Sequence, residues 1–158
     1  MHHSDWLLRE YTDAPVSVLA VTDQDSELSA LRSLTSNTQW KVHACSRISE
    51  AADLVKSHNI GVVIANRKLP DGTWVDVLEC LRVRRNAPRL IVCSRGADTQ
   101  FWAEVLSMGG YDVLTTPFER AEFLRACYLG WLSWSRASRL TTIDEPRSAS
   151  FTKAANVG

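Results

Sequence analysis

Five short runs of apolar and β-branched residues alternate along the chain with longer segments in which apolar residues recur every three or four positions. The short runs fit buried strands, and the longer segments fit amphipathic helices. Such alternation predicts an α/β fold in which helices cover a parallel sheet. The predicted strands are Val16 to Val21, Trp40 to Cys45, Gly61 to Ala65, Arg89 to Cys93 and Tyr111 to Leu114.

The four segments between the strands each predict one helix, because each carries a single apolar stripe. The stripes are Leu28, Leu31 and Leu34; Ile48, Ala51, Ala52 and Val55; Trp74, Val77, Leu78 and Leu81; and Trp102, Val105 and Leu106. The fourth helix is expected to end at Gly109-Gly110, since glycine is common just beyond helix C-termini.

The segment after Pro117 predicts a fifth helix that reaches the region of Ala137. Its apolar residues fill an arc of about 180°, which is wider than packing on one sheet face requires. These residues are Phe123, Leu124, Cys127, Tyr128, Trp131, Leu132 and Trp134. We expect part of this helix to be exposed to a partner or covered by the C-terminal tail.

The two ends of the chain differ from its centre. Residues 1–14 carry enough apolar side chains for a short turn that packs back on the domain, whereas residues 138–158 lack sustained periodicity. We therefore expect an N-terminal extension over residues 1–14, one domain over residues 15–137 and a flexible tail over residues 138–158. No repeat and no second domain, such as a helix-turn-helix, is predicted.

Composition narrows the class of function. The 18 Lys and Arg residues balance the 18 Asp and Glu residues, so the basic surface of a nucleic-acid-binding protein is not expected. The apolar runs are far shorter than the roughly 18 residues of a transmembrane helix, and the N-terminus lacks a cleavable signal pattern. These features favour a cytoplasmic protein that contacts neither nucleic acid nor membrane.

The cysteines and histidines do not predict a metal or cofactor site. Cys45, Cys80, Cys93 and Cys127 form no CxxC pair, which fits reduced thiols in a core. The histidines show no spacing with cysteines or carboxylates that would form a metal site.

Four local signatures, in this order, resemble the receiver domain of two-component response regulators over about residues 16–136. They are Val18-Leu19-Ala20-Val21-Thr22-Asp23-Gln24-Asp25, Leu69-Pro70-Asp71-Gly72, Pro88-Arg89-Leu90-Ile91-Val92-Cys93-Ser94, and Thr115-Thr116-Pro117-Phe118, which stands where the family has Lys-Pro-Phe. The resemblance implies a three-layer, doubly wound, five-stranded parallel sheet of flavodoxin-like topology with strand order 2-1-3-4-5.

The resemblance also implies where the family's chemistry would lie. The phosphoacceptor aspartate of receivers precedes the turn proline by four residues, and here that position is Asn66. Because the carboxyl ends of the first and third strands flank the crevice of this topology, Thr22, Asp23 and Asn66 are expected to converge there. An active receiver uses a carboxylate nucleophile, further acids that hold Mg²⁺, and a lysine that neutralises phosphoryl charge.

This sequence departs from that set repeatedly. Asn66 replaces the nucleophile, Thr22 replaces the first acid, and Thr116 replaces the lysine. Asp23 is left as the one clear carboxylate at the implied metal position, and Asp71 is expected to be a surface turn residue. A neutral amide cannot form an acyl phosphate as a carboxylate does, and loss of two acids weakens Mg²⁺ binding.

The family's conformational switch is altered as well. The family has a switch threonine or serine at the end of the fourth strand. Counting from Pro88 places this position at Cys93, whereas chemical similarity favours Ser94. The aromatic partner of the switch falls on Val113 or Leu114. Phosphorylation-driven switching is therefore not expected.

The first hypothesis is a stand-alone, phosphorylation-independent receiver that is not an enzyme and acts by binding a protein partner or a second copy. Asn66 is then an inert remnant, or fixes one state by hydrogen bonding to Thr116 or Asp23. By resemblance, the docking surface comprises the fourth helix, fifth strand and fifth helix. Its expected aromatic residues are Trp102, Phe123, Tyr128, Trp131 and Trp134.

Alternatives stay open at this point. Cys93 at the crevice edge fits a domain that senses a ligand or an oxidant, provided that its thiol is exposed and acidic. A second alternative is a receiver that still accepts a phosphoryl group in the presence of Mg²⁺. A cofactor-binding flavodoxin is disfavoured, because Asp23 stands where a phosphate-binding loop needs glycine and hydroxyl groups. Arg67 is expected to face solvent or to pair with Asp23.

Overall fold

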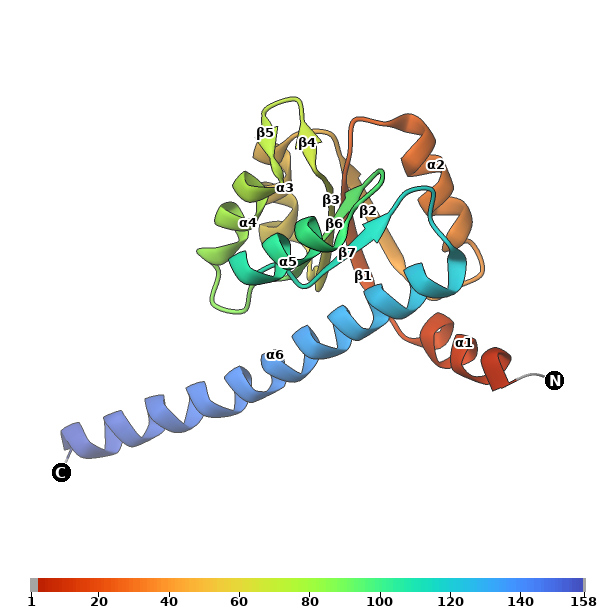
Figure 1. Ribbon diagram of the computed structural model, residues 1–158. Helices are drawn as coiled ribbons and strands as arrows, with labels where there is room; N and C mark the ends of the chain where they lie inside the picture. Colours follow the sequence, from red (N-terminus) through yellow and green to blue (C-terminus); the bar gives the residue numbers. More distant parts are fainter. Residues whose placement is uncertain (1–2, 158) are drawn as a thin grey trace.

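The computed structural model describes the backbone of residues 3–157 and the side chains of residues 8–140. Its centre is a five-stranded, all-parallel sheet in the order β2-β1-β3-β6-β7 (Figure 1). The strands are β1 (Ser17–Val21), β2 (Lys41–Cys45), β3 (Val62–Asn66), β6 (Arg89–Ser94) and β7 (Asp112–Thr115). Counted along the chain, this order is 2-1-3-4-5, so the predicted flavodoxin-like topology is confirmed, with every strand within one residue of its predicted bounds.

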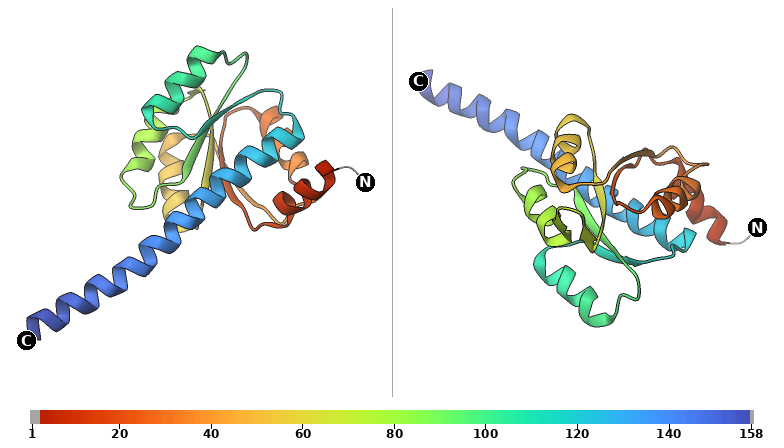
Figure 2. Two further views of the ribbon diagram at one scale, coloured as in Figure 1. Left: turned by 60° about the horizontal axis from the view of Figure 1, so that its bottom comes forward. Right: turned by 90° about the horizontal axis from the view of Figure 1, so that it is seen from above.

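Helices cover both faces of the sheet and make three layers (Figure 2). One face packs against α3 (Ile48–Ser57), α4 (Trp74–Arg82) and α5 (Thr99–Met108). The other packs against α2 (Asp25–Leu34), the first part of α6 (Arg120–Val157) and α1 (His3–Asp13). Within residues 3–157, no helix is long and apolar enough to cross a membrane.

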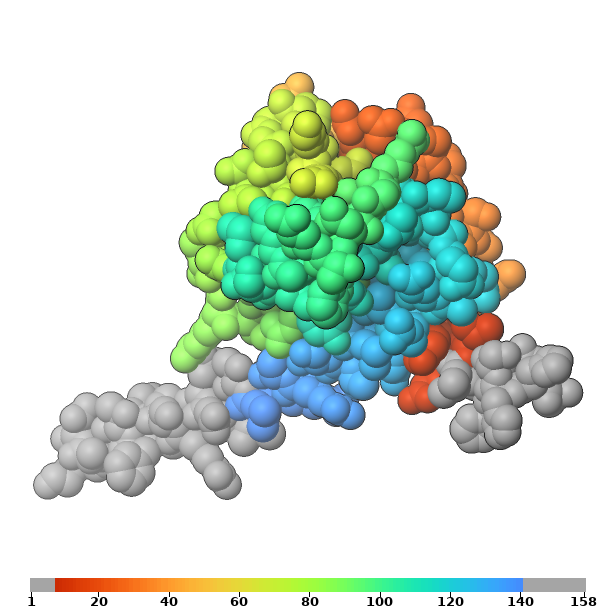
Figure 3. Space-filling view, in the orientation of Figure 1, coloured from red at the N-terminus to blue at the C-terminus, as the bar shows by residue number. Residues whose placement is uncertain are grey.

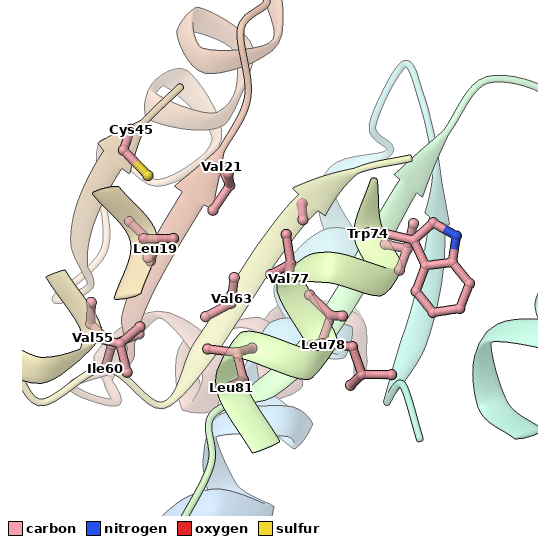
Figure 4. Close-up of a cluster of buried hydrophobic side chains, with 14 of the residues drawn as sticks. Leu19, Val21, Cys45, Val55, Ile60, Val63, Trp74, Val77, Leu78 and Leu81 are labelled. Atoms are coloured by element: carbon pink, nitrogen blue, oxygen red, sulfur yellow. The ribbon is translucent and has the colours of Figure 1, made fainter. Parts of the chain in front are cut away.

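Side-chain alternation along each strand supplies both layers of the core. In β1, Leu19 and Val21 belong to the cluster beneath α3 and α4, whereas Val18 and Ala20 belong to the cluster beneath α2 and α6. All four are at most 1% exposed. Figure 4 shows the first cluster, in which Trp74 closes the end nearest α5. Because both faces are covered, the strands are nearly continuous apolar runs.

The parallel register aligns the carboxyl ends of the strands at one edge of the sheet. Asn66 pairs with Cys93 at the ends of β3 and β6, and Ser94 pairs with Thr115 at the ends of β6 and β7. The polar residues that follow these strands therefore surround a common crevice, as expected for this topology.

A short antiparallel hairpin, which the sequence did not predict, follows β3. In it, β4 (Lys68–Leu69) pairs with β5 (Gly72–Thr73). Gly72 has a φ of 155°, and a Cβ there would lie 2.5 Å from Asp76 Oδ2. The same carboxylate accepts a hydrogen bond of 2.9 Å from the Thr73 N–H, which caps the start of α4.

The N-terminal extension is a helix, where the sequence predicted only a short turn. As expected, it packs back on the domain: the rings of Tyr11 and Tyr128 lie 4.9 Å apart. The Tyr128 hydroxyl donates to Glu10 (3.1 Å), and the Trp40 indole N–H donates to the Tyr11 carbonyl oxygen (2.7 Å). Helix α1 therefore covers part of the wide apolar face of α6.

Helix α6 is longer than predicted. Its backbone is helical to Val157, where an end near Ala137 was expected, and Figure 1 shows its last turns projecting beyond the sheet. Residues 131–145 contain neither glycine nor proline, so no helix breaker stops the helix near Ala137. The mobility of residues 138–158 stays a prediction, and the side chains of residues 141–158 lie outside the described ones.

Candidate functional site

The carboxyl edge of the sheet forms a crevice of about 680 Å³ between the ends of β3, β6 and β7 and the start of α2. Its lining residues are Gln24, Glu27, Asn66, Arg67, Lys68, Cys93, Ser94, Arg95 and Thr116. The fold thus brings together four residues that the sequence placed at the site, namely Asn66, Cys93, Ser94 and Thr116.

A chain of hydrogen bonds fixes the side chain at the phosphoacceptor position. Asn66 Nδ2 donates to Thr22 Oγ1 at 2.8 Å, and the Thr22 hydroxyl donates to Glu27 Oε2 at 3.1 Å. Thr22 Oγ1 also accepts from the Gln24 N–H at 3.0 Å. The hydrogen-bond partner of Asn66 is therefore Thr22, and neither Thr116 nor Asp23, the two partners left open by the sequence. Thr22 directly follows β1, which pairs with β3, so this bond connects the ends of two neighbouring strands.

Asp23 does not join this group. Its side chain is exposed, lies outside the crevice lining and accepts a hydrogen bond of 3.3 Å from Gln24 Nε2. The expected convergence therefore holds for Thr22 and Asn66 but not for Asp23. The acid within the crevice is instead Glu27, which lies one helical turn further along the chain and was missed.

Asp71 has a structural role that sequence spacing did not reveal. Its exposed carboxylate accepts hydrogen bonds from the Ile48 N–H at 3.0 Å and from the Ser49 N–H at 3.4 Å, at the start of α3. These backbone donors lower the pKa of the Asp71 carboxyl below its ordinary value, mainly through Ile48. Asp71 is thus a turn residue, as expected, and it caps a helix distant in sequence.

The crevice lining is positively charged. Arg67, Lys68 and Arg95 contribute three positive charges and Glu27 one negative charge, which leaves a net charge of +2 for these lining residues. The Arg67 guanidinium lies 4.0 Å above the centre of the Phe101 ring, a cation–π arrangement that holds it in place. Arg67 is exposed, as expected for a residue just past a strand end, and the alternative ion pair with Asp23 does not occur among the described side chains.

Comparison with known proteins assigns the chain to a family. The profile of the response regulator receiver domain matches residues 18–128. This chain belongs to that family. The receiver is 35% identical over 107 residues to the transcriptional regulatory protein KdpE of Mycobacterium tuberculosis, and the match covers 68% of the chain and 47% of KdpE. The chain thus spans about half the length of this relative.

Solved receiver structures share the fold. The signal receiver domain of an HD domain-containing protein from Pseudomonas fluorescens has a TM-score of 0.71 and 21% identity, with 79% of this chain and 93% of that one covered. The beryllofluoride-activated NtrC4 receiver domain, a dimer in solution, has a TM-score of 0.68 and 20% identity, with 75% and 98% covered. This chain is therefore a receiver domain of two-component signalling, a class of signalling modules.

The Mg²⁺ that the receiver family implies does not fit this crevice. Mg²⁺ is held by oxygen ligands, mainly carboxylates. Glu27 is the one acid among the described lining residues, and it already accepts a hydrogen bond from Thr22. Within residues 8–140, no cluster of three or more His, Cys, Asp or Glu side chains could hold a metal. Asn66 directs its NH₂ group to Thr22, and Arg67 with Arg95 would repel a cation.

The receiver switch position is occupied by two buried side chains. Cys93 is 3% exposed and Ser94 is 7% exposed. Burial raises the pKa of the Cys93 thiol well above its ordinary value, with Cys127 and Glu27 adding to the effect. A reactive thiolate needs the opposite conditions, namely exposure and a depressed pKa. The thiol therefore lacks the properties that an oxidant sensor requires.

The aromatic residues predicted for the docking surface divide into two groups. Trp102 on α5 is 47% exposed, and Trp131 on α6 is half-buried. Phe123, Tyr128 and Trp134 are at most 9% exposed, so their predicted role in an interface is wrong. They are buried because α6 presents them to the sheet and to α1.

Trp134 illustrates how this burial arises. Its indole N–H donates to the Asn86 carbonyl oxygen at 3.2 Å, and its ring lies against the backbone of Gly61. A Cβ at Gly61 would lie only 2.6 Å from the Trp134 ring. A glycine before β3 thus makes the space for this tryptophan, which the helical projection alone could not indicate.

Proposed function

We propose that this receiver is a phosphorylation-independent interaction module, without enzymatic activity, that acts by binding another protein or a second copy of itself. The observation that carries the proposal is the Asn66 side chain at the phosphoacceptor position. Its amide is neutral and donates a hydrogen bond to Thr22, so the group lacks both the charge and the free oxygen pair of a nucleophilic carboxylate.

The surrounding crevice supports the same conclusion. Thr116, where the family has lysine, carries no charge for a phosphoryl group, and Asp23 lies outside the lining. The crevice therefore lacks the metal ligands and the lysine that receivers use to transfer a phosphoryl group and to stabilise its negative charge.

The α5–β7–α6 face is the proposed docking surface. In Figure 3, α5 (green) and the first half of α6 (cyan and blue) lie beside each other on one side of the molecule. Trp102 is exposed there, and its indole N–H donates to Asp112 Oδ1 on β7 at 3.3 Å. Tryptophan is enriched among residues that dominate binding energy. The NtrC4 receiver is itself a dimer, and a two-fold pair is the simplest assembly of like surfaces.

Sedimentation of the purified chain tests this function. We expect self-association or capture of a partner that is unchanged by acetyl phosphate and Mg²⁺ and is weakened by Trp102→Ala. Lys56→Ala is the control, because Lys56 is exposed on α3, which packs mainly on α4, β1 and β2 and not on the α5–β7–α6 face. Association that requires acetyl phosphate would contradict the proposal.

A further inference from the structure

The crevice that the family uses for a metal carries the charge of an anion-binding site in this chain. Arg67 follows β3 and Arg95 follows β6, and β3 and β6 are paired neighbours. The two guanidinium groups therefore stand on adjacent strand ends, with Lys68 beside them and a lining charge of +2. Arginine presents N–H groups in a planar fork that matches the oxygens of phosphate.

Arg67 is held in an orientation that leaves its donors available. Its guanidinium carbon lies 4.0 Å above the centre of the Phe101 ring, and a cation–π contact holds the group without using its N–H groups as hydrogen-bond donors. Arg67 also borders a neighbouring hollow that contains Asp98 and Glu104. Neither acid lies within 4.0 Å of Arg67 or Arg95 among the described side chains, so these cations are not neutralised by an ion pair.

The uncharged lining groups add hydrogen-bond donors. Thr116 lines the crevice and carries a hydroxyl donor, whereas the Ser94 hydroxyl donates to the Arg95 carbonyl oxygen at 3.4 Å. Asn66 uses one amide hydrogen for Thr22, and the second remains because a primary amide has two. A volume of about 680 Å³ exceeds that of a phosphate group alone, which leaves room for an organic substituent.

We propose that this crevice binds a small phosphate-bearing anion reversibly and without Mg²⁺, through Arg67, Arg95 and Lys68. No covalent bond forms, because Asn66 is not a nucleophile. The Glu27 carboxylate repels the anion, and the hydrogen bond that it accepts from Thr22 partly offsets its negative charge. The inference concerns the crevice, whereas the proposed function concerns the α5–β7–α6 face, so each can fail without the other.

The test is titration of the full chain with inorganic phosphate and with phenyl phosphate, in the presence of a chelator and at constant ionic strength. Backbone and arginine side-chain NMR signals provide the readout. We expect saturable shifts at Arg67 and Arg95 without added metal. Tighter binding of phenyl phosphate would identify an organic phosphomonoester as the ligand class, and equal binding would identify free phosphate; both results support the site.

Three variants separate a site from general ionic attraction. Arg95→Gln should weaken binding about tenfold, the loss expected for one charged hydrogen bond. Glu27→Gln should tighten binding, because it removes the opposing carboxylate. Arg32→Gln is the control, since Arg32 is exposed in the last turn of α2, away from the crevice. Equal affinities for Arg95→Gln and Arg32→Gln, or binding that requires Mg²⁺, would overturn the proposal.

Discussion

The amide of Asn66 donates a 2.8 Å hydrogen bond to Thr22 Oγ1, which joins the ends of β3 and β1. In the receiver family these two positions carry acids, which would repel one another without a metal between them. Here an amide and a hydroxyl form a neutral bond instead. The crevice is thus held together by its own side chains, and the substitutions at positions 66 and 22 are complementary.

Asn66→Asp is therefore expected to destabilise the fold. A carboxylate only accepts hydrogen bonds, and the Thr22 hydroxyl already donates to Glu27. Turning that hydroxyl to the new carboxylate would break its bond to Glu27, so one bond is lost in either orientation. We expect the free energy of unfolding to fall by about 1 kcal/mol, measured as a lower urea midpoint with an unchanged slope.

Asn37→Asp serves as the control for added charge, since Asn37 lies in an exposed turn. Its urea midpoint should stay close to that of the wild-type chain. A midpoint for Asn66→Asp equal to or above that of the control would show that the bond to Thr22 contributes nothing to stability.

The fold was predictable from the sequence because the strands are short, buried and well separated. Two covered faces require apolar runs, and their carboxyl ends are marked by polar residues such as Asn66 and Thr116. The hairpin of β4 and β5 was not predictable, since two-residue strands leave no periodicity. The end of α6 was placed too early because polar residues can continue a helix as well as a tail.

The candidate site was predicted in part. The order of the four sequence signatures was enough to place Asn66 and Thr116 at the site. Glu27 and Arg95 could not be placed in this way, because their positions depend on how α2 and the loop after β6 fold over the crevice. Neither residue belongs to a motif. The burial of Tyr128 was missed for a similar reason, because its cover comes from α1, more than a hundred residues earlier.

Substitution of Asp71 should show how the hairpin supports α3. Asp71→Asn removes the charge that faces the N–H groups of Ile48 and Ser49, so Tm at neutral pH should fall. Because the folded-state pKa of Asp71 is lowered, its contribution is complete above the ordinary carboxyl pKa of about 3.9 and is lost as the pH falls through the folded value. The Tm difference from wild type should therefore shrink below about pH 4. A difference that is constant down to lower pH would exclude the charge as its cause.

Two glycine substitutions should have opposite effects. Gly61→Ala places a Cβ 2.6 Å from the Trp134 ring, and such overpacking costs about 1–3 kcal/mol. Gly130→Ala lies inside α6, where the new Cβ would meet Val62 and Tyr111 at 3.4–3.5 Å, an ordinary contact. It should stabilise the chain by up to about 1 kcal/mol through helix propensity.

Thermal and urea unfolding of the two variants provide the measurement, and each variant serves as the control for the other. A Gly61→Ala variant as stable as Gly130→Ala would mean that Trp134 does not pack on the start of β3 as described.

Intact mass of the chain after incubation with acetyl phosphate and Mg²⁺ tests the central claim most directly. The account predicts no phosphoryl addition, because Asn66 replaces the acceptor and the crevice lining repels the metal. A stoichiometric phosphoryl adduct on the wild-type chain would contradict the account, since some group in this domain would then accept a phosphoryl group despite the loss of the family's carboxylate.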